Sequence, residues 1–362
     1  MITGKEINRR FIIPPYIIDK LQSNEADRGS IITFRSDIDR KVRKRREMIG
    51  LLSQNKKTML FRSGRISAIS TPKMKMAIHD ARQLPILPGR QIWNTGRPTK
   101  FSDADVKNVY GAAKATWDFF YTIFKRNSLD NKGMLLIQSV HFREDPRIPF
   151  CNAFWDGTQM IFGDGDGKYF DSFTTDIDIV AHELTHGIID FESDLVYRDQ
   201  SGALNESFAD VFGIMVKQWA NRTRARKSDW LIGKNILIGK RYSLRSMKAP
   251  GTAYINHPDI GTDPQPGVYK DFIKTKMDDG GVHLNSGIPN YAFFITAFEL
   301  SGFSWEKAGQ IWYAALTDRR TLKKNSDFND AKNATILKAE ELFGKGSLEK
   351  NAVEKGWKEA GL

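Results

Sequence analysis

The chain has 362 residues, of which 40% are hydrophobic and 27% charged, the composition of a soluble globular protein with two or three packed units. No run of about 18 apolar residues is present, which excludes a membrane-spanning helix, and the single cysteine, Cys151, excludes an intramolecular disulfide and fits a reducing compartment. Residues 1–65 contain 16 Lys and Arg against 7 Asp and Glu, so most of the net charge of +12 lies there.

The first 65 residues are predicted to form a separate small unit. It starts with the extended segment FIIPPYII (11–18), continues through a loop at 24–30 and ends with a basic helical stretch that reaches about Ser53. The N-terminus lacks the long apolar core and the small-residue cleavage site of a secretory signal. We therefore expect the chain to be cytoplasmic as synthesised, with export by a non-classical route as the alternative.

The basic run RKVRKRR (40–46) supports two interpretations. It could bind a nucleic acid or another anionic surface, which would make the chain a nucleic-acid-associated protein. It is also typical of a solvated helix face, which we favour because no aromatic residues interleave with the charges. We expect neither a nucleic-acid partner nor a membrane partner.

The middle of the chain mixes strand and turn signals. The pattern at 103–124 predicts a long amphipathic helix, MLLIQSVHF (134–142) predicts a strand, and NAFWDGTQMIFGDGDG (152–167) predicts two strands joined at an Asp-Gly pair. The glycine-rich stretch that follows resembles the start of a calcium loop, but Thr175 stands where that loop needs a bidentate Glu, so a tight turn is the better interpretation. Beyond residue 180 helical patterns dominate, at 204–220, 290–301 and 304–316.

The stretch VAHELTHGI (180–188) carries the strongest chemical signal. Residues four apart on a helix share a face, so His182 and His186 can point at one metal ion. Glu183 lies one position round, where its carboxylate can act as a base on a water molecule. In GALNESFAD, Glu206 is the natural third zinc ligand, and Asp210 is placed to accept the second ring N–H of a ligand histidine.

A second histidine motif lies in MDDGGVHLNSGIPN (277–290). His283 on this glycine-flanked loop, with Asp278 five residues earlier, is a plausible donor to a developing oxyanion, although a lone loop histidine is more often structural. The three remaining histidines and the cysteine lack such a context and are interpreted as structural: His79, His141, His257 and Cys151.

The motifs HELTH, GALNESFAD, NAFW, GDGDG, SLRSM and GGVHLNSGIPN resemble those of the thermolysin family of zinc metallopeptidases, from about residue 76 to the C-terminus. The FIIPPYII segment resembles the protealysin branch of that family, whose precursors begin with a compact propeptide. The resemblance implies an α+β fold with a propeptide (1–65), a β-rich N-terminal catalytic domain that includes the HELTH helix (66–194) and an α-helical C-terminal domain (195–362), with the zinc site between the last two.

The resemblance also implies a role for each site residue. His182, His186 and Glu206 would hold one zinc ion, which lowers the pKa of bound water to about 7, and Glu183 would transfer that water's proton to the leaving amine. The remaining polar roles fall to oxyanion donors, an orienting carboxylate and groups that hold the peptide backbone as an added edge strand: Tyr197, His283, Asp278, Asn152, Ala153 and Arg245. An apolar pocket, implying cleavage before Leu, Phe, Ile or Val, would be formed by Phe170, Phe173, Ile179, Ile232 and Leu244.

The expected protein is thus the precursor of a neutral endopeptidase, a monomer that acts on proteins or peptides. Pro14, Pro15 and Tyr16 form a stiff, aromatic-ended segment, and we expect the propeptide to hinder the cleft until autoproteolysis removes it. A zinc-binding protein without catalysis is a further alternative, against which the presence of Glu183 and Tyr197 argues.

One departure from the family pattern concerns calcium. Asp178 and Asp229 match the acidic cluster that holds two calcium ions in thermolysins, but Lys217, Leu231 and Lys234 stand at other matching positions. Because calcium usually takes six to eight oxygen ligands, we expect none at this double site. Instead, one of the lysines should lie near one of the two carboxylates.

Overall fold

The structure is a computed structural model in which residues 11–27, 72–239 and 241–362 are described. The predicted basic run at 40–46, the helical stretch to Ser53 and the linker that follows lie outside these residues. Within them, no helix combines the length and the apolar character needed to cross a membrane.

The first half of the described chain contains a five-stranded sheet with the strand order β2-β1-β3-β5-β4. Its inner pairs, β1 with β3 and β3 with β5, are parallel, while the two edge strands β2 and β4 pair antiparallel. The edge strand β4 therefore offers one row of free backbone groups to a further strand. The strands are β1 (Met76–Asp80), β2 (Arg90–Asn94), β3 (Leu136–Val140), β4 (Ala153–Trp155) and β5 (Met160–Phe162).

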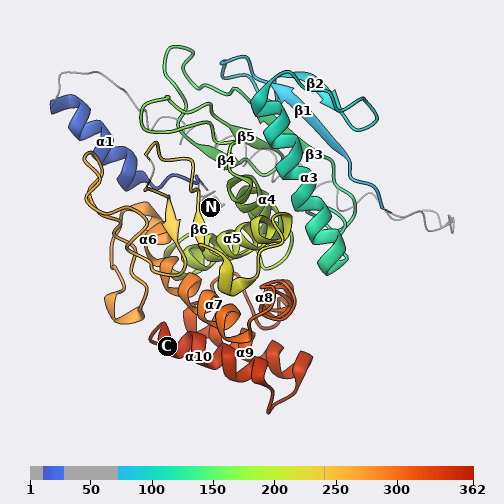
Figure 1. Ribbon diagram of the computed structural model, residues 1–362, viewed down its shortest axis with the longest axis vertical. Coiled ribbons are helices and arrows are strands. Elements are labelled where there is room, and N and C mark those ends of the chain that lie inside the picture. The colour runs from blue at the N-terminus through green and yellow to red at the C-terminus, as the bar shows by residue number, and fades with distance from the viewer. Residues whose placement is uncertain (1–10, 28–71, 240) are drawn as a thin grey trace, which may run out of the picture.

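Helix α3 (Ala104–Phe124) lies beside this sheet (Figure 1). It begins where Asp103 accepts a hydrogen bond from the Val106 N–H at 3.0 Å, and it ends at Lys125, whose φ of 57° is left-handed. The helix predicted at 103–124 and the three strands predicted within 134–167 are thus confirmed.

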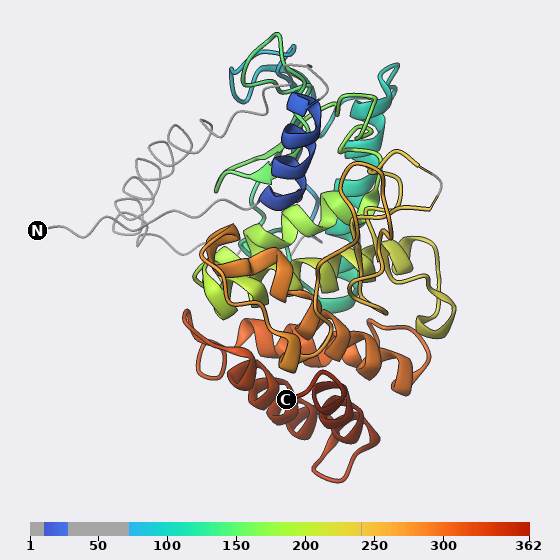
Figure 2. The same ribbon diagram turned by 90° about the vertical axis from the view of Figure 1, so that its left-hand side faces the viewer.

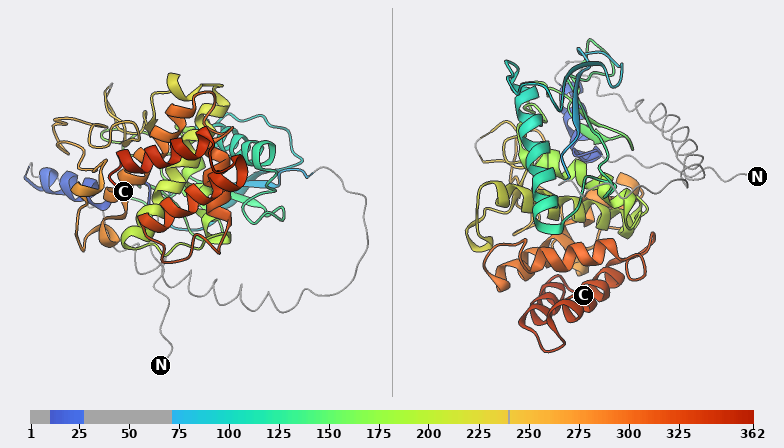
Figure 3. Two further views of the ribbon diagram at one scale, coloured as in Figure 1. Left: turned by 90° about the horizontal axis from the view of Figure 1, so that it is seen from below. Right: turned by 90° about the vertical axis from the view of Figure 1, so that its right-hand side faces the viewer.

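Two helices cross the middle of the molecule, between the sheet and the C-terminal helices (Figures 1 and 3). In α4 (Ile177–Phe191) and α5 (Asp199–Ala220) nearly every residue is buried, which is the pattern of helices enclosed on all sides. A Cβ atom on Gly213 would come within 2.8 Å of the Asp178 carbonyl oxygen, so glycine is what lets α5 approach α4 closely. This close packing brings the motif residues of both helices together.

The C-terminal half consists of helices, a two-stranded sheet and a long, mostly irregular stretch between α5 and α6. Its last helices form the lower layer in Figure 2. The α+β class, with a β-containing first domain and a helical second domain, is confirmed. The helices predicted at 204–220, 290–301 and 304–316 are present as parts of α5, α7 and α8. The elements are β6 (Leu231–Ile232), β7 (Arg245–Ser246), α6 (Asp278–Asn285), α7 (Gly287–Leu300), α8 (Ala308–Thr317), α9 (Phe328–Phe343) and α10 (Leu348–Glu359), with short 3₁₀ turns at Ala225–Lys227 and Tyr269–Asp271.

One local prediction was wrong. The FIIPPYII segment is extended only up to Pro14, because helix α1 (Pro15–Asp27) starts at the second proline, where the missing N–H costs nothing. The glycine-containing turn predicted before His283 is present, since Gly280 and Gly281 have φ values of 90° and 80° and the backbone is not helical there. His283 itself follows this turn, in the last part of α6.

Candidate active site

The two histidines of the HELTH helix face one point in the interior. The Nε2 atoms of His182 and His186 are 3.1 Å apart, and both side chains are fully buried. The Nδ1 atom of His182 lies 2.8 Å from Asp210 Oδ1, and that of His186 lies 2.8 Å from Asn205 Oδ1. Since both oxygens are acceptors, each Nδ1 carries the ring proton, and each Nε2 of the neutral ring directs a lone pair at the same point.

Such an arrangement requires a positive charge between the rings. Burial lowers the pKa of His182, but the carboxylates of Asp210 and Glu206 outweigh it and raise this pKa to about 9. A proton or a metal ion satisfies the same lone pair, and the two compete for it.

Glu206 of α5 completes the set. Its Oε1 lies 3.4 Å from His186 Nε2 and its Oε2 lies 3.4 Å from His182 Nε2, while Oε2 accepts no hydrogen bond from the described residues although it is buried. One ligand atom from each of the three residues lies within 4.8 Å of the others. Two imidazole nitrogens and one carboxylate are the donor set of a catalytic zinc site, so the residues present fit the metal that the sequence implies.

Glu183 points toward the edge strand. Its Oε2 accepts a hydrogen bond from the Trp155 N–H at 3.1 Å, and its buried Oε1 has no hydrogen-bond partner among the described residues. Burial raises the pKa of Glu183 to about 8. A carboxylate that holds a proton this readily is suited to accept one from water.

On the other side of the metal ligands stands a tyrosine–histidine pair. Asp278 accepts from the His283 ring at 2.6 Å and from its backbone N–H at 2.8 Å, which directs Nε2 of His283 into the cleft. The Tyr197 hydroxyl lies 3.2 Å from that Nε2 and donates to Glu206. Gly280 permits the turn, because a Cβ atom there would lie 2.1 Å from an oxygen of Asp199.

Arg245 lies next to the histidine site, through its contact with Asp210. Its guanidinium donates to both oxygens of Asp210, at 2.8 Å each, and is almost completely buried. Asp210 thereby joins Arg245 to the ligand His182. The predicted pocket residues belong to the same buried core and are all less than 2% exposed: Phe170, Phe173, Ile179, Ile232 and Leu244.

The chain's own N-terminal segment lies against the predicted substrate-binding residues. The Ile12 N–H donates to the Ala153 carbonyl at 3.2 Å, and the Ile13 N–H donates to Asn152 Oδ1 at 3.0 Å. Phe11 forms an antiparallel bridge with Phe154, so the segment adds a strand at the free edge of β4.

Two further contacts anchor the same segment. Arg245 donates to the Ile12 carbonyl at 3.1 Å, and His283 Nε2 lies 2.7 Å from the Phe11 carbonyl oxygen. Four of the residues that were expected to bind a peptide or its oxyanion therefore contact residues 11–13: Asn152, Ala153, Arg245 and His283.

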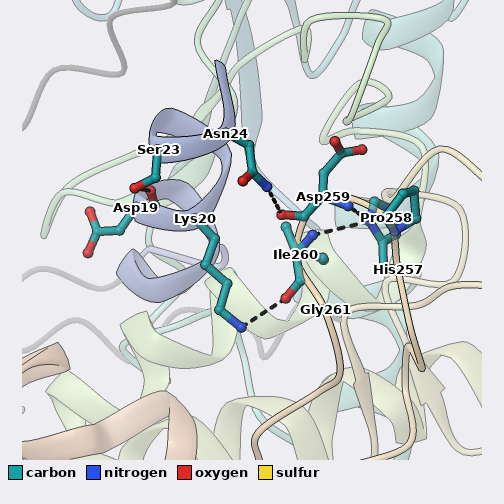
Figure 4. A pocket seen from close by; sticks show the side chains of 9 residues that line it. All are labelled: Asp19, Lys20, Ser23, Asn24, His257, Pro258, Asp259, Ile260 and Gly261. Atoms are coloured by element: carbon teal, nitrogen blue, oxygen red, sulfur yellow. Dashed lines mark hydrogen bonds between the residues drawn. The ribbon is translucent and has the colours of Figure 1, made fainter. Parts of the chain in front are cut away.

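Helix α1 continues from this segment and rests on the loop at 257–261 (Figure 4). Lys20 donates to the Ile260 carbonyl at 2.9 Å and Asn24 donates to the Asp259 carbonyl. Ile17 and Leu21 of the same helix are buried, with at most 1% exposure. Pro14 is also buried, whereas Pro15 is exposed and Tyr16 packs against the core at intermediate exposure.

The predicted lysine–carboxylate pairing beside the site is confirmed. Lys217 lies 2.9 Å from the buried Asp178 and 3.9 Å from Asp229, and Lys234 lies 3.0 Å from Asp229. The Leu231 carbonyl accepts a further bond from Lys217 at 2.8 Å. Two ammonium groups thus occupy positions around these carboxylates.

Sequence reasoning missed two contributions. Asn205, which orients His186, directly precedes Glu206 in the sequence, and its amide next to a ligand could have suggested this role. No sequence pattern indicated that Arg245 pairs with Asp210, because 35 residues separate the two side chains.

Known proteins share this architecture along nearly the whole chain. The "Precursor of Protealysin, Metalloproteinase from Serratia proteamaculans" is similar in structure with a TM-score of 0.80 and 40% identity, covering 97% of this chain and 99% of that one. The "Extracellular metalloprotease" of Pectobacterium carotovorum subsp. carotovorum is 47% identical over 288 residues, 79% of this chain and 80% of its own. "Protease PrtS" of Photorhabdus sp. (strain Az29) is 39% identical over 361 residues, 98% of this chain and 92% of its own.

The predicted cytoplasmic location is contradicted by these comparisons. The relative from Pectobacterium carries the word extracellular in its name while matching this chain over most of its length. A hydrophobic leader is one feature that directs secretion, so failing to find one was too little evidence for the prediction.

Two family models divide the chain between them. "Thermolysin metallopeptidase, catalytic domain" matches residues 40–190, and "Thermolysin metallopeptidase, alpha-helical domain" matches residues 193–362. Together with the relatives and with the metal-binding geometry, they establish the class of enzyme. The chain belongs to the thermolysin family of zinc metallopeptidases, in its protealysin-like branch, and is a metalloendopeptidase.

Proposed function

We propose that the chain is the precursor of a zinc endopeptidase whose N-terminal segment blocks its own cleft. The observation that carries this proposal is the row of backbone hydrogen bonds between residues 11–13 and the groups expected to bind a substrate. A protein or peptide substrate needs the same groups, so it has to displace the segment first. We assign residues 1–65 to this propeptide, and residues 66–194 and 195–362 to the two catalytic domains.

In the reaction, zinc bound by His182, His186 and Glu206 supplies a polarised water and a Lewis acid. Glu183 accepts the proton of the attacking water and delivers it to the leaving amine, and the proximity of its carboxylate to the Trp155 backbone supports this role because it places the base beside the edge strand. Tyr197 and His283 donate to the developing oxyanion. Asp278 keeps the His283 ring oriented for that bond.

The apolar pocket sets the specificity. Its five residues offer no polar group to a side chain, and burial of a branched or aromatic side chain there supplies binding free energy. We therefore propose cleavage on the N-terminal side of Leu, Phe, Ile or Val.

The roles of Glu183 and His186 can be separated by substitution. Glu183→Gln removes the base and leaves the three ligands, so the protein should bind one zinc ion with wild-type stoichiometry and lose at least about 100-fold in kcat. His186→Ala should lose both the zinc and the activity. Zinc content by elemental analysis and turnover of a fluorogenic peptide are the measurements. A Glu183→Gln protein that cleaves the peptide near the wild-type rate would show that another group is the base.

Removal of the propeptide is proposed to be autocatalytic, with a cut between about residues 52 and 70, a region outside the described residues. The new N-terminus should be an apolar residue such as Met59, Leu60, Phe61 or Ile66, as the pocket demands. Loss of residues 1–65 lowers the net charge from +12 to about +3, so retention on a cation exchanger should drop. An intact precursor as active as its clipped product would contradict the inhibitory role.

The mature enzyme is proposed to be a monomer with one zinc ion and without calcium at the double site of the family. We propose that it acts outside the cell, on the strength of the extracellular relative from Pectobacterium.

A further inference from the structure

The register of the N-terminal segment in the cleft is specific. It runs antiparallel to β4, and four backbone groups in sequence meet four cleft groups. The Phe11 carbonyl meets the proposed oxyanion donor His283, while the N–H and the carbonyl of Ile12 meet Ala153 and Arg245. The Phe11–Ile12 peptide bond consequently has its carbonyl oxygen at the oxyanion donor and its nitrogen at the edge strand.

We infer that the Phe11–Ile12 bond is itself a cleavage site, which the enzyme hydrolyses in its own precursor separately from the cut proposed between residues 52 and 70. This inference rests on the catalytic roles proposed above. The alignment of the Phe11 carbonyl with the oxyanion donor favours this inference over a segment that only covers the site, because such a segment need not place a carbonyl there.

The side chains on either side of the bond agree with this assignment. Ile12 is fully buried and belongs to the same buried core as the pocket residues, so the chain offers a branched apolar side chain directly after the bond. The Phe11 ring packs edge-on against Phe154, with 5.2 Å between ring centroids. The bond is thus flanked by two apolar side chains, one buried and one packed against an aromatic ring.

Pro14 and Pro15 lie where they do not remove any of the backbone hydrogen bonds of the segment. The cleft uses the N–H groups of Ile12 and Ile13, and Pro14 is the first residue without an N–H. Pro14 and Pro15 therefore stiffen the segment directly beyond the last bonded donor. A proline one residue earlier would have removed the bond to Asn152.

The reaction is a simple hydrolysis. Water adds its oxygen to the Phe11 carbonyl carbon, the carbon–nitrogen bond breaks, and the proton that Glu183 has taken from water passes to the Ile12 nitrogen. The second proton of the water also ends on this nitrogen, so the products are a carboxylate on Phe11 and an ammonium group on Ile12. Because Ile17, Leu21, Lys20 and the rest of α1 stay docked on the catalytic part, the cut leaves the fragment that starts at Ile12 in the cleft.

The test follows the intact mass of the full-length chain after zinc is added to metal-free protein. A species spanning residues 12–362 should appear, with Ile12 as its N-terminus by sequencing, at a rate unchanged over a 100-fold dilution because the reacting groups belong to one molecule. Glu183→Gln should not form it. Ile12→Asp should form it at least about tenfold more slowly, since a carboxylate does not suit an apolar pocket, whereas Ile12→Leu should keep it. Leu348→Asp, at a site 77% exposed in the C-terminal helix α10, is the matched control and should behave as wild type.

Three results would count against the inference. Self-cleavage elsewhere, or turnover of an added peptide, while the Phe11–Ile12 bond stays intact would overturn it and leave the proposed function standing. The 12–362 species appearing equally fast in Glu183→Gln would assign the cut to a contaminating protease. No hydrolysis of any peptide bond by the zinc-loaded chain would refute both the inference and the proposed catalytic roles.

Discussion

Asp210 shows how a single carboxylate connects the parts of this site. It accepts hydrogen bonds from the ligand His182, from Arg245 and, at 2.9 Å, from Asn290. Burial alone would raise its pKa, but Arg245 and His182 overcome this and lower it to about 2, so the group stays charged. The same charge orients His182, a proposed metal ligand, and positions Arg245, which donates to the Ile12 carbonyl. The proposed metal site and the site that holds residues 11–13 therefore share one electrostatic support.

His141 supports a prediction about pH and stability. Its ring lies 2.8 Å from Asp164 and 3.1 Å from Asp103, and the hydrogen bond to Asp164 is the main cause that raises its pKa from 6.5 to about 9. Because the folded state binds this proton more tightly than the unfolded state, the stabilisation is fully present below pH 6.5 and is lost as the pH rises through about 9. His141→Gln should therefore lower the Tm at about pH 6, and the difference from wild type should close by about pH 10.

A matched control comes from His79, whose pKa is lowered by burial. There the sign is reversed, since the folded state favours the neutral ring, and its contribution is lost as the pH falls through 6.5 and below. Melting curves of His141→Gln and of the corresponding His79→Gln protein at several pH values provide the comparison. A His141→Gln deficit that stays constant from about pH 6 to pH 10 would show that protonation of this ring does not stabilise the fold.

At the scale of a residue, prediction from sequence succeeded where spacing on one helix determines geometry. His182 and His186, four apart, converge in the structure because helical pitch alone brings them to one face. Arg245 was expected to bind a carbonyl, and it does contact one, but its larger interaction with Asp210 depends on how β7 packs against α5. No pattern within either segment encodes that packing.

At the scale of an element, the packing of α5 against α4 brings Lys217 of α5 next to Asp178 of α4, beside the site. Lys217 reaches the fully buried Asp178 at 2.9 Å, with its own side chain 18% exposed, while Lys234 and Asp229 are 53% and 36% exposed. Removing one partner of a buried pair typically costs about 3–5 kcal/mol, because the other charge is left uncompensated. An exposed pair is worth about 0–1 kcal/mol.

Lys217→Met should consequently lower the free energy of unfolding by about 3 kcal/mol, and Lys234→Met, its control in the same cluster, by less than about 1 kcal/mol. Adding Asp178→Asn to Lys217→Met should recover most of the loss, because no charge is then left buried. Denaturant unfolding of the zinc-loaded protein measures all of these. Equal losses for the two lysine variants would refute the assigned role of the buried pair.

The cluster of Lys217, Lys234, Asp178 and Asp229 predicts that calcium does not change the thermal stability of the protein. Lys217 and Lys234 bring positive charge to the place where two calcium ions would need six to eight oxygen ligands each. With zinc present, the Tm should be nearly the same in a calcium-specific chelator and in millimolar calcium. A rise of many degrees on addition of calcium would mean that the cation binds despite the lysines.

Element prediction failed at α1 for an instructive reason. The adjacent Pro14 and Pro15 indicated an extended chain, yet a proline is also favourable as the first residue of a helix, and Ile17 and Leu21 are four apart as on one helical face. That face is buried against the catalytic part. The tertiary contact therefore decided between an extended segment and a helix, which the local sequence favoured about equally.

At the scale of the whole molecule, the proposed inhibition depends on holding the N-terminal segment against the catalytic part of the chain. Residues 11–13 occupy the cleft, but α1 and its contacts with the loop at 257–261 keep them there at high effective concentration (Figure 4). We call the hydrogen bonds of Lys20 and Asn24 to this loop the latch; neither residue bonds to a proposed catalytic group among the described residues. Weakening the latch should therefore release the cleft without altering the chemistry.

The double variant Lys20→Ala/Asn24→Ala should make the full-length precursor more active on an added peptide. If each lost hydrogen bond is worth about 1 kcal/mol, the fraction of molecules with an open cleft rises about fivefold for one bond and up to about 25-fold for both. Initial rates measured before any clipping, with intact mass as a check, give the comparison, and Ser23→Ala on the same helix is the control because Ser23 bonds only within α1. After the propeptide has been removed, variant and wild type should have identical kcat/KM, since neither residue remains. A precursor whose activity is unchanged by loss of the latch would show that residues 11–13 block the cleft by their own contacts alone.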